Sequence, residues 1–263
     1  MSCCAGRPNR PRAIRLPRLK LPGGYRGYIV GYRRQVTAGT IGMESALFWG
    51  SVHMLLFVVW LATELGFFTA IACVKNPARS FETRARLVRI ATLTHALPRM
   101  CFALMLPTGV ELTGAINVYP LTPGLRVASW AIGAVWVGVI LISARGQGRP
   151  LAANLRIVEL VFQAFAGLSF VAYGLNSLAT GAPIDDPWFA AKLFLFGLVF
   201  WASIAVDIGL RPFYAPFYEI ALEGSTSERE EAISAAINHA LAATVTLYVL
   251  IAAIAFIGNV KLF

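Results

Sequence analysis

The chain has 263 residues, of which 57% are hydrophobic and only 14% are charged, and its formal net charge is +10. Runs of about 20 apolar residues recur along it, the length of an α-helix that crosses a bilayer. These values exclude an ordinary water-soluble domain and indicate an integral membrane protein. Because the positive charge lies in the N-terminal segment and between the apolar runs, it indicates anionic lipid and membrane orientation rather than nucleic-acid binding.

A basic segment precedes the apolar runs. Residues 1–44 contain nine Lys and Arg residues before the first acid, Glu44, and they lack the apolar core and small-residue cleavage site of a secretory signal. We expect residues 1–44 to be flexible or to lie on the membrane surface, and residues 45–263 to form a transmembrane helical bundle. Docking of the basic segment on anionic lipid or an acidic partner is an alternative that stays open.

Six apolar segments are predicted to span the membrane, at about 46–74, 92–116, 127–145, 155–179, 188–209 and 235–258. The short connections between them favour antiparallel neighbours in an all-α bundle. The longest connection, residues 210–234, contains RPFYAPFYE, whose Pro and aromatic residues suit a membrane interface. Ser227 and Glu230 have the spacing of a capping box, so the last helix is expected to begin about two turns before the lipid.

The distribution of basic residues predicts orientation. The first, third and fifth connections and adjoining helix ends carry Lys75, Arg79, Arg84, Arg86, Arg89, Arg145, Arg149, Arg156, Arg211 and Arg229, whereas the second and fourth carry only Arg126. This bias favours cytoplasmic odd-numbered connections. The basic residues of segment 1–44 argue for the opposite orientation, because such a segment resists translocation without a signal.

Ionisable and other polar residues inside the predicted spans fall into two layers when the helices are threaded antiparallel. One layer contains His53, Glu111, Asn176 and Lys192, and the other contains Glu64, His95, Arg99, Glu159, Asp207 and His239. A charge at the centre of a bilayer costs about 2.5–3.5 kcal/mol on insertion scales. Such residues therefore tend to face the bundle interior and to mark functional positions.

The layer with six ionisable residues has two interpretations. In the first, its members form ion pairs that orient helices, Arg99 with Glu64 or Glu159 and Asp207 with Arg211. In the second, they form a proton path, a ligand pocket or a second cofactor site.

The layer with His53 has a sharper chemical interpretation. A neutral imidazole two turns into a span can ligate a haem iron or another metal, and Trp60, on the same helical face, would line a planar cofactor. The alternative is that His53 bonds to a neighbouring helix and that Trp60 serves packing.

Two motifs carry a family resemblance. The first span reads H-x6-W-L-A from His53 to Ala62, and the fifth begins P-W-F-A-A-K-L with Lys192. Both resemble the membrane superfamily that includes HemJ-type protoporphyrinogen oxidases and the copper-resistance protein CopD. The resemblance implies b-type haem, with His53 as axial ligand and Lys192 as second ligand or charge partner. Trp60 would then line the pocket, and Glu111 would be a nearby acid or proton acceptor.

These observations give a leading hypothesis of a haem- or porphyrin-associated redox protein in a bacterial-type inner membrane. A quinone or a protein partner would exchange electrons with it. Two alternatives stay open: a non-enzymatic accessory subunit of a larger membrane complex, and a transporter of a metal or small solute. Whether the protein is an enzyme is likewise open.

Overall fold

A computed structural model describes residues 24–146 and 149–260, and all regular structure in them is helical. The elements are α1 (Gly24–Val74), α2 (Phe81–Thr94), α3 (Ala96–Ala115), α4 (Pro123–Arg145), α5 (Pro150–Thr180), α6 (Pro187–Leu210), the 3-10 turn η1 (Arg211–Phe213), α7 (Tyr214–Glu223) and α8 (Ser227–Val260). Within these described ranges, six segments are long and apolar enough to cross a membrane. The predicted all-α bundle of six spans is confirmed, and the chain is a multi-pass membrane protein.

The chain divides into two units, residues 1–42 and 43–263, and the second unit contains all six candidate spans. Helix α1 begins at Gly24, within the segment that was expected to be a tail. Residues 1–23 of that segment lie outside the described residues. The account below concerns residues 43–260.

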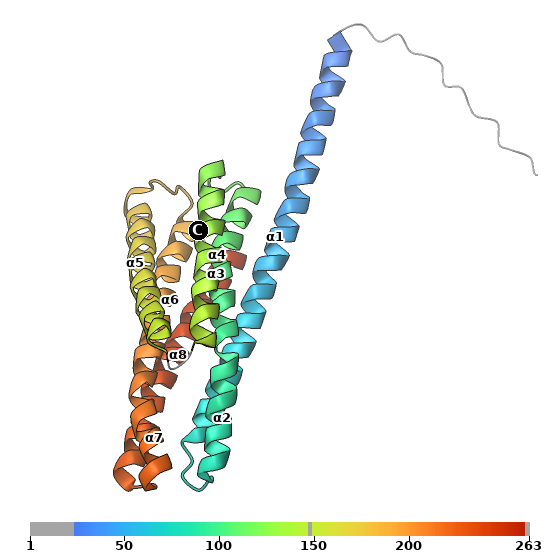
Figure 1. Cartoon of the computed structure of the whole chain (residues 1–263). Coiled ribbons are helices and arrows are strands. Elements are labelled where there is room, and N and C mark those ends of the chain that lie inside the picture. The colour runs from blue at the N-terminus through green and yellow to red at the C-terminus, as the bar shows by residue number, and fades with distance from the viewer. Residues whose placement is uncertain (1–23, 147–148, 261–263) are drawn as a thin grey trace, which may run out of the picture. The chain divides into compact units, whose positions relative to one another are not determined.

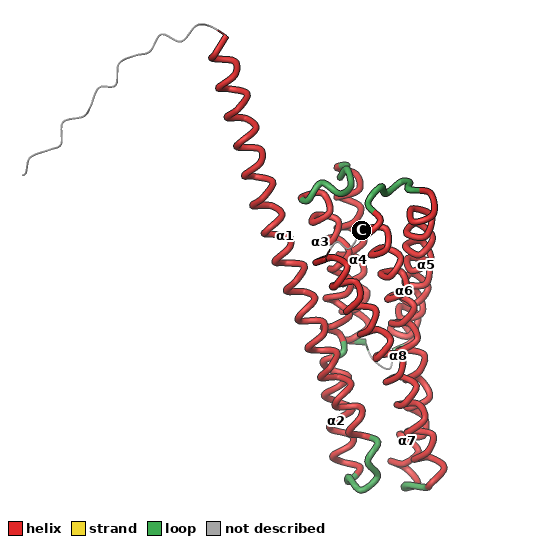
Figure 2. The backbone as a smooth tube through the Cα atoms, turned by 180° about the vertical axis from the view of Figure 1, so that it is seen from behind, coloured by secondary structure: helices red, strands yellow, loops and turns green. Residues whose placement is uncertain are grey.

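Consecutive spans run antiparallel, as their short connections predicted. The α3–α4 and α5–α6 connections lie at one end of the bundle, and the α1–α2 and α7–α8 connections lie at the other (Figures 1 and 2). The second of these ends carries Lys75, Arg79 and Arg229, and it is called the basic end below. Helix α5 packs on α6, α6 packs on α8, and α3 packs on α4.

Local sequence signals set most helix boundaries. Helices α4, α5 and α6 each begin with a proline, which has no N–H to leave unpaired in the first turn. Thr122 caps α4 by accepting a hydrogen bond from the N–H of Leu125 at 3.2 Å. Helix α5 ends at Gly181, whose φ of +69° is a left-handed conformation that glycine adopts without strain.

The second span is interrupted at His95, which separates α2 from α3. Pro98 explains the interruption, because its ring clashes with the carbonyl four residues earlier and it cannot donate a backbone hydrogen bond. The predicted second span begins at residue 92, but the structure places that residue inside α2, whose first residue is Phe81.

The connection predicted for residues 210–234 is mostly helical. η1 and α7 occupy Arg211–Glu223, and only residues 224–226 separate α7 from α8. The predicted capping box is wrong in its partners, because the hydroxyl of Thr226, not Ser227, accepts a hydrogen bond from the N–H of Arg229 at 3.3 Å. Glu230 is engaged instead by Arg84 and Ser225.

Helix lengths show that part of the bundle extends beyond the bilayer. Helix α4 has 23 residues, which span about 34 Å, close to the hydrocarbon thickness of about 30 Å. Helix α8 has 34 residues, which span about 51 Å. Helices α2 and α7 extend past the end of α4 and the start of α5 at the basic end (Figure 1). The excess length of α8 is therefore on that side.

Two hydrophobic cores hold the bundle together. The basic-end core joins α1, α2, α6, η1, α7 and α8 through Phe67, Phe68, Ile71, Val74, Ala91, Val206, Leu210, Phe213, Phe217, Ile220, Ile233, Ala236, Ile237 and Ala240. The central core joins α1, α3, α4, α6 and α8 through Trp60, Cys101, Phe102, Ala103, Met105, Trp136, Ile140, Val199, Phe200, Ala202, Leu247 and Ile251. In α1 the central core ends at Trp60 and the basic-end core begins at Phe67, so Glu64 lies between them.

Candidate functional site

Four charged side chains form a chain of ion pairs across α3, α5 and α6. Arg99 of α3 donates from Nε to Glu159 of α5 at 3.2 Å and also contacts that carboxylate with a terminal nitrogen. Arg156 donates to Glu159 at 2.7 Å and pairs with Asp207 of α6. These four residues are called the buried charge cluster below. With two guanidinium and two carboxylate groups, its formal charge is zero.

Glu159 is the centre of this cluster. Its side chain is 0% exposed, and it accepts further hydrogen bonds from Trp136 Nε1 at 3.2 Å and Gln163 Nε2 at 3.3 Å. A buried carboxylate needs such donors because desolvation removes the water that would otherwise stabilise its charge. The predicted pairing of Arg99 with Glu159 is confirmed, and the carboxylate is fully engaged.

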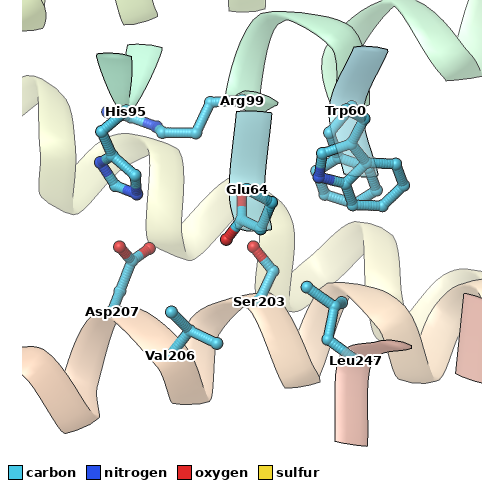
Figure 3. A pocket seen from close by; sticks show the side chains of 9 residues that line it. Trp60, Glu64, His95, Arg99, Ser203, Val206, Asp207 and Leu247 are labelled. Atoms are coloured by element: carbon cyan, nitrogen blue, oxygen red, sulfur yellow. The ribbon is translucent and has the colours of Figure 1, made fainter. Parts of the chain in front are cut away.

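A small cavity lies beside the cluster. It is lined by Trp60, Glu64, His95, Arg99, Phe102, Ser203, Val206, Asp207 and Leu247. In Figure 3, Ser203 and Asp207 project from α6 toward the side on which Glu64 and His95 lie. The cavity volume is about 20 Å³, which is enough for about one water molecule. Its polar lining supplies the partners that a buried water requires.

Glu64 is the acid of this region that the ion pairs leave out. It is 6% exposed, and no described residue donates a direct hydrogen bond to its carboxylate. His95, which also lines the cavity, stacks on Phe67 with 4.5 Å between ring centroids. Trp60 also lines the cavity, one helical turn from Glu64. Its ring stacks on that of Phe102 with 4.9 Å between ring centroids.

His53 is bonded to the neighbouring helix α3. Its Nδ1 lies 3.1 Å from Thr108 Oγ1, and the Thr108 hydroxyl itself lies 2.8 Å from the carbonyl of Leu104. Because a hydroxyl has one hydrogen, which is directed to Leu104, it accepts from His53 Nδ1–H. The Nε2 atom of a neutral His53 then carries the lone pair. Gly109 allows this close approach, since a Cβ there would lie 3.3 Å from the His53 ring.

The other residues predicted for this layer are distributed over separate contacts. Lys192 of α6 approaches Gly258 of α8, where a Cβ would lie 3.1 Å from its Nζ. Glu111 accepts from Arg126 Nε at 3.1 Å and from Trp130 Nε1 at 3.1 Å, so its carboxylate is engaged by two side chains of α4. Among the described residues, no group of three or more His, Cys, Asp or Glu side chains could hold a metal ion.

Three outcomes in the other layer differ from the sequence-based expectation. Asp207 pairs with Arg156 rather than Arg211, which is exposed on η1. His239 is exposed on the outside of α8 and does not line the cavity. Arg156 was treated as a connection charge and was missed as a member of the cluster. Its spacing of three residues from Glu159 on one helix was the available signal.

Comparisons with protein-family models, curated proteins and solved structures find no match for this chain. The site is therefore interpreted from its own geometry.

Proposed function

We propose that this membrane protein binds and transfers a proton at the cavity, with Glu64 and His95 as the exchanging groups. The observation that carries the proposal is the position of Glu64 beside a charge cluster that is already neutral. Arg99 and Arg156 are compensated by Glu159 and Asp207. Glu64 is thus the buried acid that can gain or lose a proton without breaking an ion pair.

The surroundings of Glu64 suit proton exchange. His95 faces the same cavity, and a neutral imidazole can accept a proton at one ring nitrogen while it donates from the other. A water in the cavity would connect the two groups and Ser203 by hydrogen bonds. Gln163 Oε1, beside Glu159, is buried without a hydrogen-bond partner among the described residues, and this atom adds a second place for ordered water.

The cavity volume favours a proton over an organic solute. Sites for small organic molecules occupy about 300–1,000 Å³, whereas this cavity measures about 20 Å³. Its occupant is therefore no larger than water.

Proton flux into proteoliposomes tests the proposal. The purified protein is reconstituted in vesicles containing a pH-sensitive dye, and a potassium gradient with valinomycin supplies the driving potential. We expect acidification of the vesicle interior with the parent protein. Glu64→Gln, which keeps the shape of the side chain but cannot exchange the proton, should lower the rate about 100-fold or more, in the range attributed to positioned acid–base groups.

Glu82→Gln is the matched control, because Glu82 is an exposed acid paired with Arg86 on α2 at the surface. It should leave the flux at the parent level. A parent protein with no more flux than empty vesicles would overturn the proposal, and so would equal flux in the parent and Glu64→Gln.

A second candidate function is haem binding between His53 and Lys192, with a quinone or a protein as electron partner. The observation that favours it is the hydrogen bond from His53 Nδ1–H to Thr108, which leaves Nε2 available as an iron ligand. When bound, the group would supply one-electron redox chemistry. The family resemblance of these two positions supports the same assignment.

A visible absorption spectrum tests this second function. Protein purified in mild detergent from haem-replete cells should show reduced-minus-oxidised haem bands. The bands should be lost in His53→Ala and shifted in Lys192→Ala, while Glu82→Gln should keep them. A haem-free parent preparation would contradict the assignment without affecting the proton proposal, which depends on Glu64.

A further inference from the structure

Helix α2 is anchored to the start of α8 by one buried arginine. Arg84 has a side-chain exposure of 2%, and its two terminal nitrogens donate to the two carboxylate oxygens of Glu230 at 2.7 and 2.9 Å. Ser225 donates to the same carboxylate at 2.6 Å. The Arg84 guanidinium also lies 5.8 Å from the ring centroid of Phe217 on α7. This side chain therefore connects α2 with both α7 and α8.

The Arg84–Glu230 pair is not arranged for maximal stability. The Nε atom of Arg84 is buried and has no hydrogen-bond partner among the described residues. A buried ion pair recovers its desolvation cost only when all its polar atoms are bonded, and such pairs often define one arrangement rather than add stability. Loss of either partner leaves an uncompensated charge and favours separation of the helices.

A break in the backbone lies at the other end of α2. The break at His95 follows from Pro98, and His95 itself lines the cavity beside Glu64. Between the break and Arg84, α2 contributes Ala91 to the basic-end core, with Leu87 and Val88 partly buried against it. The contacts that hold α2 in place thus include this ion pair, a narrow apolar face and a ring contact between Phe81 and Phe217 of α7 with 5.3 Å between centroids. Rotation about a helix break is absorbed by dihedral changes in a few residues at the break.

The basic-end core separates the cavity from water on that side. Arg156 lies six residues after the first residue of α5, or about 9 Å along the helix axis. Beyond this depth the bundle continues through α2, α7 and the start of α8, as Figure 1 shows. A proton that reaches the cavity from the basic end must pass between these helices.

We propose that α2 is a lid over the cavity, with its hinge at the α2–α3 break and the Arg84–Glu230 pair as the latch. The proposal rests on the proton function above and adds the route: water enters from the basic end when the latch opens. Opening moves α2 away from α7 and α8 and exposes the cavity lining at His95 and Ser203.

Thiol accessibility at Ser203 tests the lid directly. Cys3, Cys4, Cys73 and Cys101 are replaced by Ala, and Ser203→Cys places one thiol in the cavity lining. The rate of modification by a small charged thiol reagent is measured in the parent background and with Arg84→Ala. We expect slow modification in the parent and an increase of about tenfold or more with Arg84→Ala, because breaking one partner of a buried pair is strongly destabilising.

Glu230→Gln provides a second latch variant that keeps the size and hydrogen-bonding capacity of the side chain. It should accelerate modification in the same direction, and gel filtration shows whether each variant stays folded. Arg86→Ala is the matched control on the same helix, because the Arg86–Glu82 pair is exposed on both sides, at 75% and 76%. It should leave the rate unchanged. Folded Arg84→Ala and Glu230→Gln proteins with the rate of Arg86→Ala would overturn the lid.

The accessibility measurement does not depend on proton flux, so the two proposals fail separately. Faster modification without flux in any variant would retain the lid and reject the proton function. Flux that requires Glu64, together with unchanged accessibility in both latch variants, would retain the proton function and reject the lid.

Discussion

Glu159 holds Arg99 and Arg156 together, because its carboxylate is the common acceptor for both guanidinium groups. Replacing Glu159 by Leu would leave two partly buried arginines with one remaining carboxylate, that of Asp207. We expect the free energy of unfolding to fall by about 3–5 kcal/mol, the usual cost of removing one partner of a buried ion pair. Thermal unfolding in detergent would show the change as a lower Tm.

Glu82→Leu is the corresponding control at an exposed ion pair. The Glu82–Arg86 bond of 2.5 Å is shorter than several bonds in the cluster, yet a solvated pair contributes about 0–1 kcal/mol. If both substitutions lowered the Tm equally, burial would not be what makes the cluster important for stability.

The sequence predicted that charged side chains lie within the bundle. It predicted less well which of these side chains contact one another. Threading the spans placed Glu64, His95, Arg99, Glu159 and Asp207 at one depth, and the structure brings these five together. Depth does not specify rotation about the helix axis. His239 shares the depth but faces outward, and it could not be separated from the others without knowing which face of α8 is packed.

At the scale of elements, α5 and α6 are in backbone contact. A Cβ on Gly197 would lie 2.6 Å from the backbone nitrogen of Val171, and one on Gly174 would lie 2.5 Å from the backbone nitrogen of Phe194. Small residues permit this close approach. The resulting van der Waals packing holds the helices together inside lipid, where the hydrophobic effect does not drive their association. Gly197→Ala should therefore separate the helices and destabilise the protein by about 1–3 kcal/mol, as overpacking does.

Gly138 on α4 offers the matched comparison. No atom lies within 4 Å of a Cβ built there, so Gly138→Ala should change the free energy of unfolding by less than about 1 kcal/mol, with helix propensity favouring Ala. Differential scanning fluorimetry of both variants in the same detergent separates the two cases. Equal Tm values would show that the α5–α6 contact can relax without cost.

Long apolar elements were predicted well, and short amphipathic ones were not. The six spans follow from length and composition, which are properties of the sequence alone. Helix α7 has 10 residues, and its proline and aromatic residues resemble an interfacial loop. Its helical state depends on the burial of Phe217 and Ile220 in the basic-end core. Such tertiary packing cannot be deduced from a local pattern.

At the scale of the whole molecule, the antiparallel order of spans determines which charges can meet. It places α3, α5 and α6 side chains at one depth near the basic end, where Arg156 and Arg99 find carboxylates. The sequence was therefore enough to predict the layer in which the site lies, the charged residues of that layer and one of its ion pairs. The cavity could not be predicted, because its volume is what remains after the rotamers of Trp60, Phe102 and Leu247 are fixed.

The arrangement of two hydrophobic cores around a polar layer has a consequence for how the protein unfolds. Apolar contact makes residues unfold together, and here Glu64, His95 and Asp207 interrupt that contact. The basic-end core and the central core are then separate cooperative units. The amide hydrogens of α2 and α7 should exchange with solvent deuterium in one kinetic group, ahead of those in α4 and α5, so that one end of the protein can fluctuate while the bundle in lipid keeps its packing.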